Sequence, residues 1–279
     1  MSKNNNNNNT DDDDDDDDAD GKKKKKKKVH LICTWPRARE ACARLRECRL
    51  LALDMEGAPL GVRTSLLQLA VSPDEIYLFD VLRLGQHRLF DAAHLLPVLT
   101  DPRTLKLCYD GRGDGGALFH CHGVRPFGLY DLQIVYTSLF QAPGDRFLKG
   151  LHRAVTQLLP PGDAEIDAFA ERKRALRASQ PAVWLQRPLP PAALAYAAAD
   201  VAHLFAMHRL WSPFFAERAV LDATAARIMA APSRAQEAHC VDFAPLRARR
   251  LCFVYRRDGG AGDDNKDAAP RLPLAIAST

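Results

Sequence analysis

The stretch Leu50-Leu51-Ala52-Leu53-Asp54-Met55-Glu56-Gly57 ends an apolar run in two carboxylates set two residues apart. The run is short and bounded by polar residues, which predicts a buried strand over residues 50–54. Side chains at positions i and i+2 of a strand point to the same side, so we expect Asp54 and Glu56 to lie close together. Two such carboxylates repel each other, and a divalent cation, which prefers oxygen ligands, would offset that repulsion. The alternative interpretation is a strand that ends in a solvated acidic turn.

Similar patterns on the C-terminal side of this stretch predict the rest of the sheet. Runs of apolar residues predict strands over residues 65–71 and 75–80, separated by the turn Ser72-Pro73-Asp74, so three consecutive strands form an antiparallel meander. A further short strand is predicted over residues 104–108. Helices are predicted over residues 37–46, 90–99, 113–121, 130–140, 148–158, 164–178, 191–210 and 217–230. This order predicts an α/β class, with a mixed sheet and helices packed on it.

Composition narrows the class of protein. Hydrophobic residues make up 47% of the 279 residues, which is enough to bury a core. No apolar stretch is long enough for a membrane span, and the polar N-terminus lacks the apolar segment of a secretory signal. The seven cysteines are odd in number and form no Cys-x-x-Cys pair, so neither a disulfide framework nor a structural zinc site is expected. We therefore expect an intracellular protein, nuclear or cytoplasmic and not secreted, without a membrane partner.

Three segments are predicted along the chain. Residues 1–28 hold runs of Asn, Asp and Lys that can bury little apolar surface, which predicts a disordered low-complexity tail. Its lysine run is either a nuclear-import or phosphate-binding signal or a repeat expansion without a specific role. Residues 29–211 are predicted to form the folded domain. Residues 212–279 are predicted to form a C-terminal helical extension and a flexible tail.

Tyr196, Asp200 and Asp114 are further candidates for the site that begins at Asp54 and Glu56. Tyr196 and Asp200 stand four residues apart in an alanine-rich helix, so they share one helical face. A phenol beside a carboxylate suits a site that holds a metal and orients a water, although an amphipathic helix with a half-buried tyrosine has the same pattern. Asp114 stands at the start of a predicted helix, either as a capping charge or as a further metal ligand.

The order Asp54-x-Glu56, then Asp114, then Tyr196-x-x-x-Asp200 resembles the pattern of the DEDDy 3′–5′ exonucleases. Flanking segments within residues 49–211 resemble that family in order and spacing, namely Leu66-Leu67-Gln68-Leu69, Tyr77-Leu78-Phe79-Asp80, Lys106-Leu107, Asp131-Leu132-Gln133, Lys149-Gly150-Leu151 and Trp184-x-x-Arg187-Pro188-Leu189. The resemblance implies a ribonuclease H-like α/β fold, with a mixed five-stranded sheet flanked by helices. It also implies that residues 29–211 are a 3′–5′ exonuclease domain.

Two segments are most similar to the Egalitarian-like branch of the RNase D relatives, namely Asp54-Met55-Glu56-Gly57 and Asp110-Gly111-Arg112-Gly113-Asp114. Members of that branch can lose activity and act as RNA-binding adaptors. This chain keeps the four acids and the tyrosine, which favours catalysis. A catalytically weak or inactive exonuclease-like RNA-binding adaptor is the alternative hypothesis. Another is an interaction scaffold that uses the charged tail and the alanine-rich C-terminal region.

The resemblance also implies a mechanism. Asp54, Glu56, Asp114 and Asp200 would bind two divalent cations, Mg²⁺ or Mn²⁺, and Tyr196 would orient the attacking water. The substrate would be single-stranded nucleic acid, with RNA favoured over DNA on the branch resemblance. The product would be a nucleoside 5′-monophosphate. Partner proteins are not predicted.

Overall fold

The computed structural model describes residues 27–57, 64–142, 145, 147–177 and 182–230. Its strands are β1 Lys28–Ile32, β2 Leu50–Gly57, β3 Thr64–Ser72, β4 Glu75–Asp80, β5 Leu105–Cys108 and β6 Leu129–Asp131. Its helices are α1 Trp35–Arg46, α2 Val81–Leu84, α3 Gln86–Leu89, α4 Leu96–Thr100, α5 Gly111–His122, α6 Leu132–Phe140, α7 Leu151–Leu158, α8 Ala164–Arg177, α9 Pro191–Ala202, α10 Leu204–Trp211 and α11 Glu217–Ala230, with short 3-10 helices η1 Ala182–Leu185 and η2 Ser212–Phe214. The predicted low-complexity tail, apart from residues 27–28, and the predicted C-terminal tail after residue 230 lie outside the described residues.

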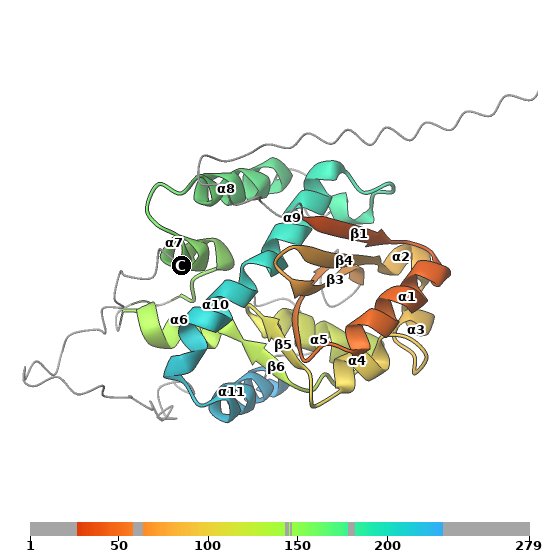
Figure 1. Ribbon diagram of the computed structural model, residues 1–279, viewed down its shortest axis with the longest axis horizontal. Helices are drawn as coiled ribbons and strands as arrows, with labels where there is room; N and C mark the ends of the chain where they lie inside the picture. The colour runs from red at the N-terminus through yellow and green to blue at the C-terminus, as the bar shows by residue number, and fades with distance from the viewer. Residues whose placement is uncertain (1–26, 58–63, 143–144, 146, 178–181, 231–279) are drawn as a thin grey trace, which may run out of the picture.

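The strands of the described residues form one mixed sheet in the order β1-β4-β3-β2-β5-β6 (Figure 1). The strands β2, β3 and β4 pair antiparallel, whereas β1 pairs parallel with β4, and β5 pairs parallel with both β2 and β6. The strand β3 lies in the interior of the sheet, and residues 64–70 are all buried. The strand β2 lies between β3 and β5, but β5 pairs only with residues 50–52, so the end of β2 that carries Asp54 and Glu56 pairs with β3 alone.

Two apolar cores lie on opposite faces of the sheet, which makes three layers. One core joins the sheet to α6–α10, and it includes Trp184, Trp211 and the alanines of α9. The other joins the sheet to α1–α5, and it includes Leu45, Phe79 and Leu118. Figure 1 shows α9 and α10 in succession along one side of the sheet, with α7 and α8 beyond them. The small alanine side chains let α9 lie close to β2, β3 and β4, which it contacts.

The predicted α/β class and the antiparallel meander over β2, β3 and β4 are confirmed. The number of strands was wrong, because the described residues form six and not five. The strand β1 is an edge strand whose first residues are exposed, so it lacks the apolar alternation of a half-buried strand. The strand β6 has only three residues, and it pairs with β5 across a long separation in sequence. Residues 130 and 131 therefore belong to a strand and not to the start of the predicted helix 130–140.

Two of the predicted helices also differ from the structure. In place of the helix predicted over residues 90–99, the structure has the shorter helix α4, Leu96–Thr100. The Asp91 carboxylate accepts a hydrogen bond from the Ala93 backbone N–H at 2.9 Å, and this local bond competes with a helical turn. The predicted helix 191–210 is divided at His203 into α9 and α10. The helix predicted over residues 217–230 has the same bounds as α11.

A buried ion pair joins two segments that are far apart in sequence. Asp80 ends β4, and its carboxylate accepts hydrogen bonds from Arg187 Nε at 2.6 Å and from Arg187 Nη2 at 2.9 Å. Arg187 Nη2 also donates to the Ser65 carbonyl of β3 at 3.1 Å. The segment that leads into α9 is therefore held against the sheet.

None of the described helices combines the length and the apolar character that crossing a bilayer requires.

Candidate active site

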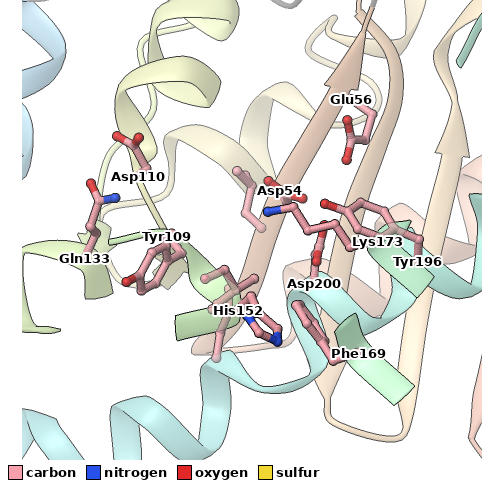
Figure 2. Close-up of a pocket in the computed structure, with 14 residues that line it drawn as sticks. Asp54, Glu56, Tyr109, Asp110, Gln133, His152, Phe169, Lys173, Tyr196 and Asp200 are labelled. Atoms are coloured by element: carbon pink, nitrogen blue, oxygen red, sulfur yellow. The ribbon is translucent and has the colours of Figure 1, made fainter. Parts of the chain in front are cut away.

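The strand β2 and the helix α9 bring three acids together. Asp54 and Glu56 lie near the end of β2, and Asp200 is buried on α9, which packs against that strand. One carboxylate oxygen from each of the three lies within 4.8 Å of the other two. Figure 2 shows Asp54, Glu56 and Asp200 facing one cavity, and we call these three residues the acid cluster. The i, i+2 spacing on a strand thus places both carboxylates on one side, as the sequence predicted.

Tyr196 lies one turn before Asp200 on α9, and its hydroxyl is hydrogen-bonded to the Asp200 carboxylate. The tyrosine ring is half-buried and packs near Trp184, with ring centroids 6.2 Å apart. Burial raises the pKa of Tyr196, and the negative charges of Asp200 and the rest of the acid cluster raise it further. The hydroxyl therefore keeps its proton near neutral pH and can donate that proton to Asp200.

Asp114 lies beside the acid cluster but is not one of the three residues that meet within 4.8 Å. It stands in the first turn of α5 and is only 4% exposed. Its carboxylate accepts a hydrogen bond from the Met55 backbone N–H, so it faces β2 between the two cluster residues of that strand. The structure therefore brings all four predicted acids to one region, with Asp114 behind Asp54.

The electrostatics of the acids show unbalanced negative charge. Burial raises the pKa of Asp54 to about 7. Burial also raises the pKa of Glu56 well above its usual range, and the neighbouring carboxylates raise it further. The pKa of Asp200 is raised by burial and by Asp54, while Tyr196 and the cations of α8 act in the opposite direction. The negative charge of these ionised acids is therefore not balanced by nearby positive charge at neutral pH.

The donor atoms of the acid cluster suit a hard divalent cation. All three residues offer carboxylate oxygens, which Mg²⁺ and Mn²⁺ prefer over nitrogen or sulfur ligands. Gln68 lies opposite Asp54 in the pairing of β2 with β3, so its side chain is on the same face of the sheet. Its amide is fully buried, and neither the oxygen nor the nitrogen has a hydrogen-bond partner among the described residues. The Gln68 amide can therefore still form hydrogen bonds with groups other than the described residues.

A cavity of about 230 Å³ adjoins the acid cluster. In Figure 2 the acid cluster lies toward one side, Tyr109, Asp110 and Gln133 lie on the opposite side, and His152 and Phe169 lie along a third wall. Lys173 of α8 extends toward the carboxylates, where it acts electrostatically on Asp200. The cavity therefore combines an acidic wall, aromatic rings and a cation.

Several of these lining residues were not singled out as site residues from the sequence, namely Tyr109, Asp110, His152, Phe169 and Lys173. The sequence could have indicated Tyr109 and Asp110, because they directly follow β5 and so lie at the same end of the sheet as Asp54. His152, Phe169 and Lys173 lie on α7 and α8, and ordinary amphipathic spacing does not distinguish them from residues of a packed helix.

Two segments that carried the family resemblance, residues 131–133 and 149–151, contribute to the wall of the cavity and to its support. The Asp131 carboxylate accepts hydrogen bonds from the backbone N–H groups of Asp110 and Gly111, at 2.9 and 3.2 Å. The Lys149 carbonyl accepts from the Tyr109 hydroxyl at 3.0 Å and from Gln133 Nε2 at 3.2 Å. These residues thus position the walls of the cavity through hydrogen bonds to the backbone.

Comparison with known families gives one match that covers most of the described fold. A model of a 3′–5′ exonuclease family matches residues 30–211. The matched region includes the acid cluster, Asp114 and Tyr196, and it ends before α11.

Two curated relatives resemble parts of the same region. The piRNA biogenesis protein EXD1 of Mus musculus is 26% identical over 169 residues, which cover 59% of this chain and 29% of that protein. Ribonuclease D of Gluconacetobacter diazotrophicus is 34% identical over 145 residues, which cover 52% of this chain and 32% of that protein. The chain therefore spans about a third of the length of these relatives.

Solved structures of RNase D from Trypanosoma brucei have a similar fold. Its complex with GMP gives a TM-score of 0.63 at 27% identity, covering 74% of this chain and 65% of that chain. Its complex with RNA U12 gives a TM-score of 0.62 at 26% identity, covering 75% of this chain and 72% of that chain. These likenesses confirm the predicted ribonuclease H-like fold, whereas the placement in the Egalitarian-like branch stays a prediction.

Proposed function

The chain belongs to the 3′–5′ exonuclease family, and from this premise we propose that it hydrolyses single-stranded nucleic acid from the 3′ end, with RNA preferred over DNA. The observation that carries the proposal is the acid cluster, with the Tyr196 hydroxyl bonded to Asp200 at the edge of the same cavity. A purely structural site would pair these acids with arginine or lysine, and a solvated acidic turn would leave them apart. Neither description fits three carboxylates that share a half-buried space.

In this proposal the acid cluster and Asp114 hold divalent cations, two Mg²⁺ or Mn²⁺ ions. When bound, such ions supply positive charge for the reacting phosphate and lower the pKa of a coordinated water. The all-oxygen donor set and the raised pKa of Glu56 support this role. Asp114 would act from behind Asp54, because its carboxylate also accepts the Met55 N–H.

Tyr196 would orient the attacking water. Its phenol donates its proton to Asp200 when that carboxylate is ionised, which leaves the phenol oxygen free to accept a hydrogen bond from a water. A raised pKa excludes the tyrosine as a base at neutral pH, so positioning is the role that its chemistry supports. The product expected from attack at the terminal phosphodiester is a nucleoside 5′-monophosphate.

The remaining walls of the cavity would hold the 3′-terminal nucleotide. The rings of Tyr109 and Phe169 offer faces on which a base can stack, and such stacking tolerates any sequence. Lys173 offers a cation to a phosphate near the acid cluster. The relatives named ribonuclease D, together with the complex of the Trypanosoma brucei enzyme with RNA, support RNA as the preferred strand.

The test uses 5′-labelled single strands of RNA and DNA of one sequence, each made with a 3′-hydroxyl and with a blocked 3′ end. With Mn²⁺ or Mg²⁺ we expect stepwise shortening of the unblocked strands, faster for RNA, and release of nucleoside 5′-monophosphates. Glu56→Gln should abolish this shortening. The matched control is Glu40→Gln, because Glu40 is exposed on α1, on the opposite face of the sheet.

Three outcomes would contradict the proposal. Internal cleavage of blocked strands would show an endonuclease. Equal activity of Glu56→Gln and the wild type would place the reaction elsewhere. Binding of RNA without any shortening, in the presence of either metal, would favour the RNA-binding adaptor.

A further inference from the structure

The helix α11 lies beyond the region matched to the family, yet it packs against the elements that carry part of the site. It contacts β6 and α5, and Val220 and Thr224 on it are buried. One contact with α5 is at Gly115, the residue after Asp114. A Cβ atom added at Gly115 would lie 2.6 Å from Ile228 Cδ1. Without a side chain, Gly115 leaves the space that the Ile228 side chain of α11 occupies against α5.

Arg227 of α11 forms hydrogen bonds with three residues, two of which line the cavity. Its side chain is 10% exposed. Nη1 donates to Asp131 Oδ2 at 2.6 Å, while Nη2 donates to Gln133 Oε1 at 2.8 Å and to Asp110 Oδ1 at 3.3 Å. Asp110 and Gln133 both line the cavity. One guanidinium group therefore ties two residues of the wall to a buried aspartate.

Asp131 in turn determines how the chain enters α5. Its carboxylate accepts the backbone N–H groups of Asp110 and Gly111, the residues at the start of that helix. Asp110 has a φ of +63°, a left-handed conformation that a residue other than glycine adopts only with support. The hydrogen bonds to Asp131 supply this support, and the helix then carries Asp114 one turn further to its place behind Asp54.

Arg227 also reduces repulsion at this side of the site. Asp110 and Asp114 stand at the start of α5, where the carboxylate of the buried Asp131 also lies. The guanidinium of Arg227 lies between two of those acids and pairs with both. Without Arg227, Asp131 would have no cationic partner among the described residues, and Asp110 would pair only with Arg112, beside the buried Asp114.

We propose that Arg227 is a positioning residue of the active site, which makes α11 part of the catalytic unit although it lies outside the matched exonuclease region. It acts through Asp131 and Asp110, which hold the turn into α5 and with it Asp114. This inference rests on the proposed function for its catalytic meaning. The placement of the turn and of the carboxylates can also be measured in a protein that has no activity.

The experiment compares the full chain with three variants. Arg227→Met removes the charge at similar length, and Arg227→Lys keeps the charge but loses the forked geometry. Arg218→Met is the matched control, because Arg218 lies on the same helix, is 85% exposed and pairs with Asp222 at the surface. Three quantities are measured: hydrogen exchange of the Asp110 and Gly111 amides, Mn²⁺ binding followed by electron paramagnetic resonance, and kcat and KM on single-stranded RNA.

For Arg227→Met we expect roughly tenfold faster exchange at Asp110 and Gly111, and roughly tenfold weaker Mn²⁺ binding, the size of effect seen when outer partners of metal ligands are lost. We expect kcat to fall by a similar factor while KM changes little, because the change acts on alignment and not on strand contact. Arg227→Lys should be intermediate in all three quantities. Arg218→Met should match the wild type.

A lower melting temperature of Arg227→Met with unchanged exchange at Asp110, Mn²⁺ binding and kcat would overturn the inference, because Arg227 would then only stabilise the fold. If that variant does not fold, wild-type values for Arg227→Lys would overturn it equally. If the wild type binds Mn²⁺ but hydrolyses nothing, the proposed function fails, and exchange and Mn²⁺ binding still decide whether Arg227 positions the site.

Discussion

Two acids of the acid cluster, Asp54 and Glu56, stand on the same sheet as the buried aspartates Asp80 and Asp131, but the two pairs of acids meet different partners. The Asp80 carboxylate accepts hydrogen bonds from Nε and Nη2 of Arg187 and from the backbone N–H of Arg83. The Asp131 carboxylate accepts hydrogen bonds from the Arg227 side chain and from three backbone N–H groups. The carboxylates of the acid cluster face one another instead, within 4.8 Å.

The difference separates structural acids from candidate catalytic acids. Asp80 and Asp131 obtain their compensation from within the chain, so their charges hold segments together. Within the acid cluster, the cations of α8 act on Asp200 only in part, and the pKa of Glu56 is raised by its burial and by every neighbouring charge that acts on it. Buried charge without an internal partner is suited to a cation that arrives from solution.

The largest effect is expected for Asp54→Asn. We expect the rate of 3′ hydrolysis to fall by roughly a thousandfold or more, because a charged ligand is lost where transition-state charge must be balanced. The melting temperature of the metal-free protein should stay the same or rise, because repulsion within the acid cluster is relieved. Single-turnover hydrolysis and thermal unfolding measure the two quantities. Near wild-type turnover would show that the acid cluster is not the site.

Tyr196→Phe is expected to have the next largest effect. The ring and its packing remain, and only the hydroxyl bonded to Asp200 is lost. We expect kcat to fall roughly tenfold to a thousandfold, with little change in strand affinity. Tyr77→Phe is the matched control, because the Tyr77 hydroxyl bonds to Glu75 on β4, away from the cavity. Weaker RNA binding with unchanged kcat would make Tyr196 a binding residue.

Asp80→Asn should have the reverse profile to Asp54→Asn. It leaves the buried Arg187 guanidinium without its charge partner, which should reduce the free energy of unfolding by about 3 kcal/mol. Hydrolysis per folded molecule should remain close to that of the wild type. Denaturant unfolding gives the first quantity, and Asp101→Asn is the control, because its forked pair with Arg103 lies at the surface. If Asp80→Asn loses activity at unchanged stability, the distinction between the two kinds of acid fails.

The smallest expected effect is a dependence of stability on pH. The folded-state pKa of Asp54 is raised to about 7, above its unfolded value of about 3.9. Between these values the folded protein binds more protons than the unfolded chain, so stability falls as pH rises from about 4 to about 7. Thermal unfolding in the presence of a chelator should show this fall. Asp54→Asn should show a smaller fall, and added Mn²⁺ should reduce it in the wild type. A metal-free wild type whose stability rises over this range would contradict the repulsion inferred for the acid cluster.

Local patterns predicted much of the fold and of the acid set. The antiparallel arrangement of β2, β3 and β4 follows from short apolar runs with a tight turn, and α11 follows from helical spacing over residues 217–230. The strand β6 was missed because three residues carry too little pattern to compete with the helix that follows. The rings of Tyr109 and Phe169 were missed as cavity walls because each would also suit an ordinary core.

The sequence by itself determined which acids could act together. Asp54 and Glu56 are two residues apart on a strand, and Tyr196 and Asp200 are four residues apart on a helix. Each spacing places the two side chains on one face of the element, whatever surrounds them. Only the tertiary structure decided which acids are paired and which are not. Asp80 meets Arg187 and Asp131 meets Arg227 across about a hundred residues of chain, through contacts between elements that no local period encodes. The acids left without such a partner are those to which we attribute the chemistry.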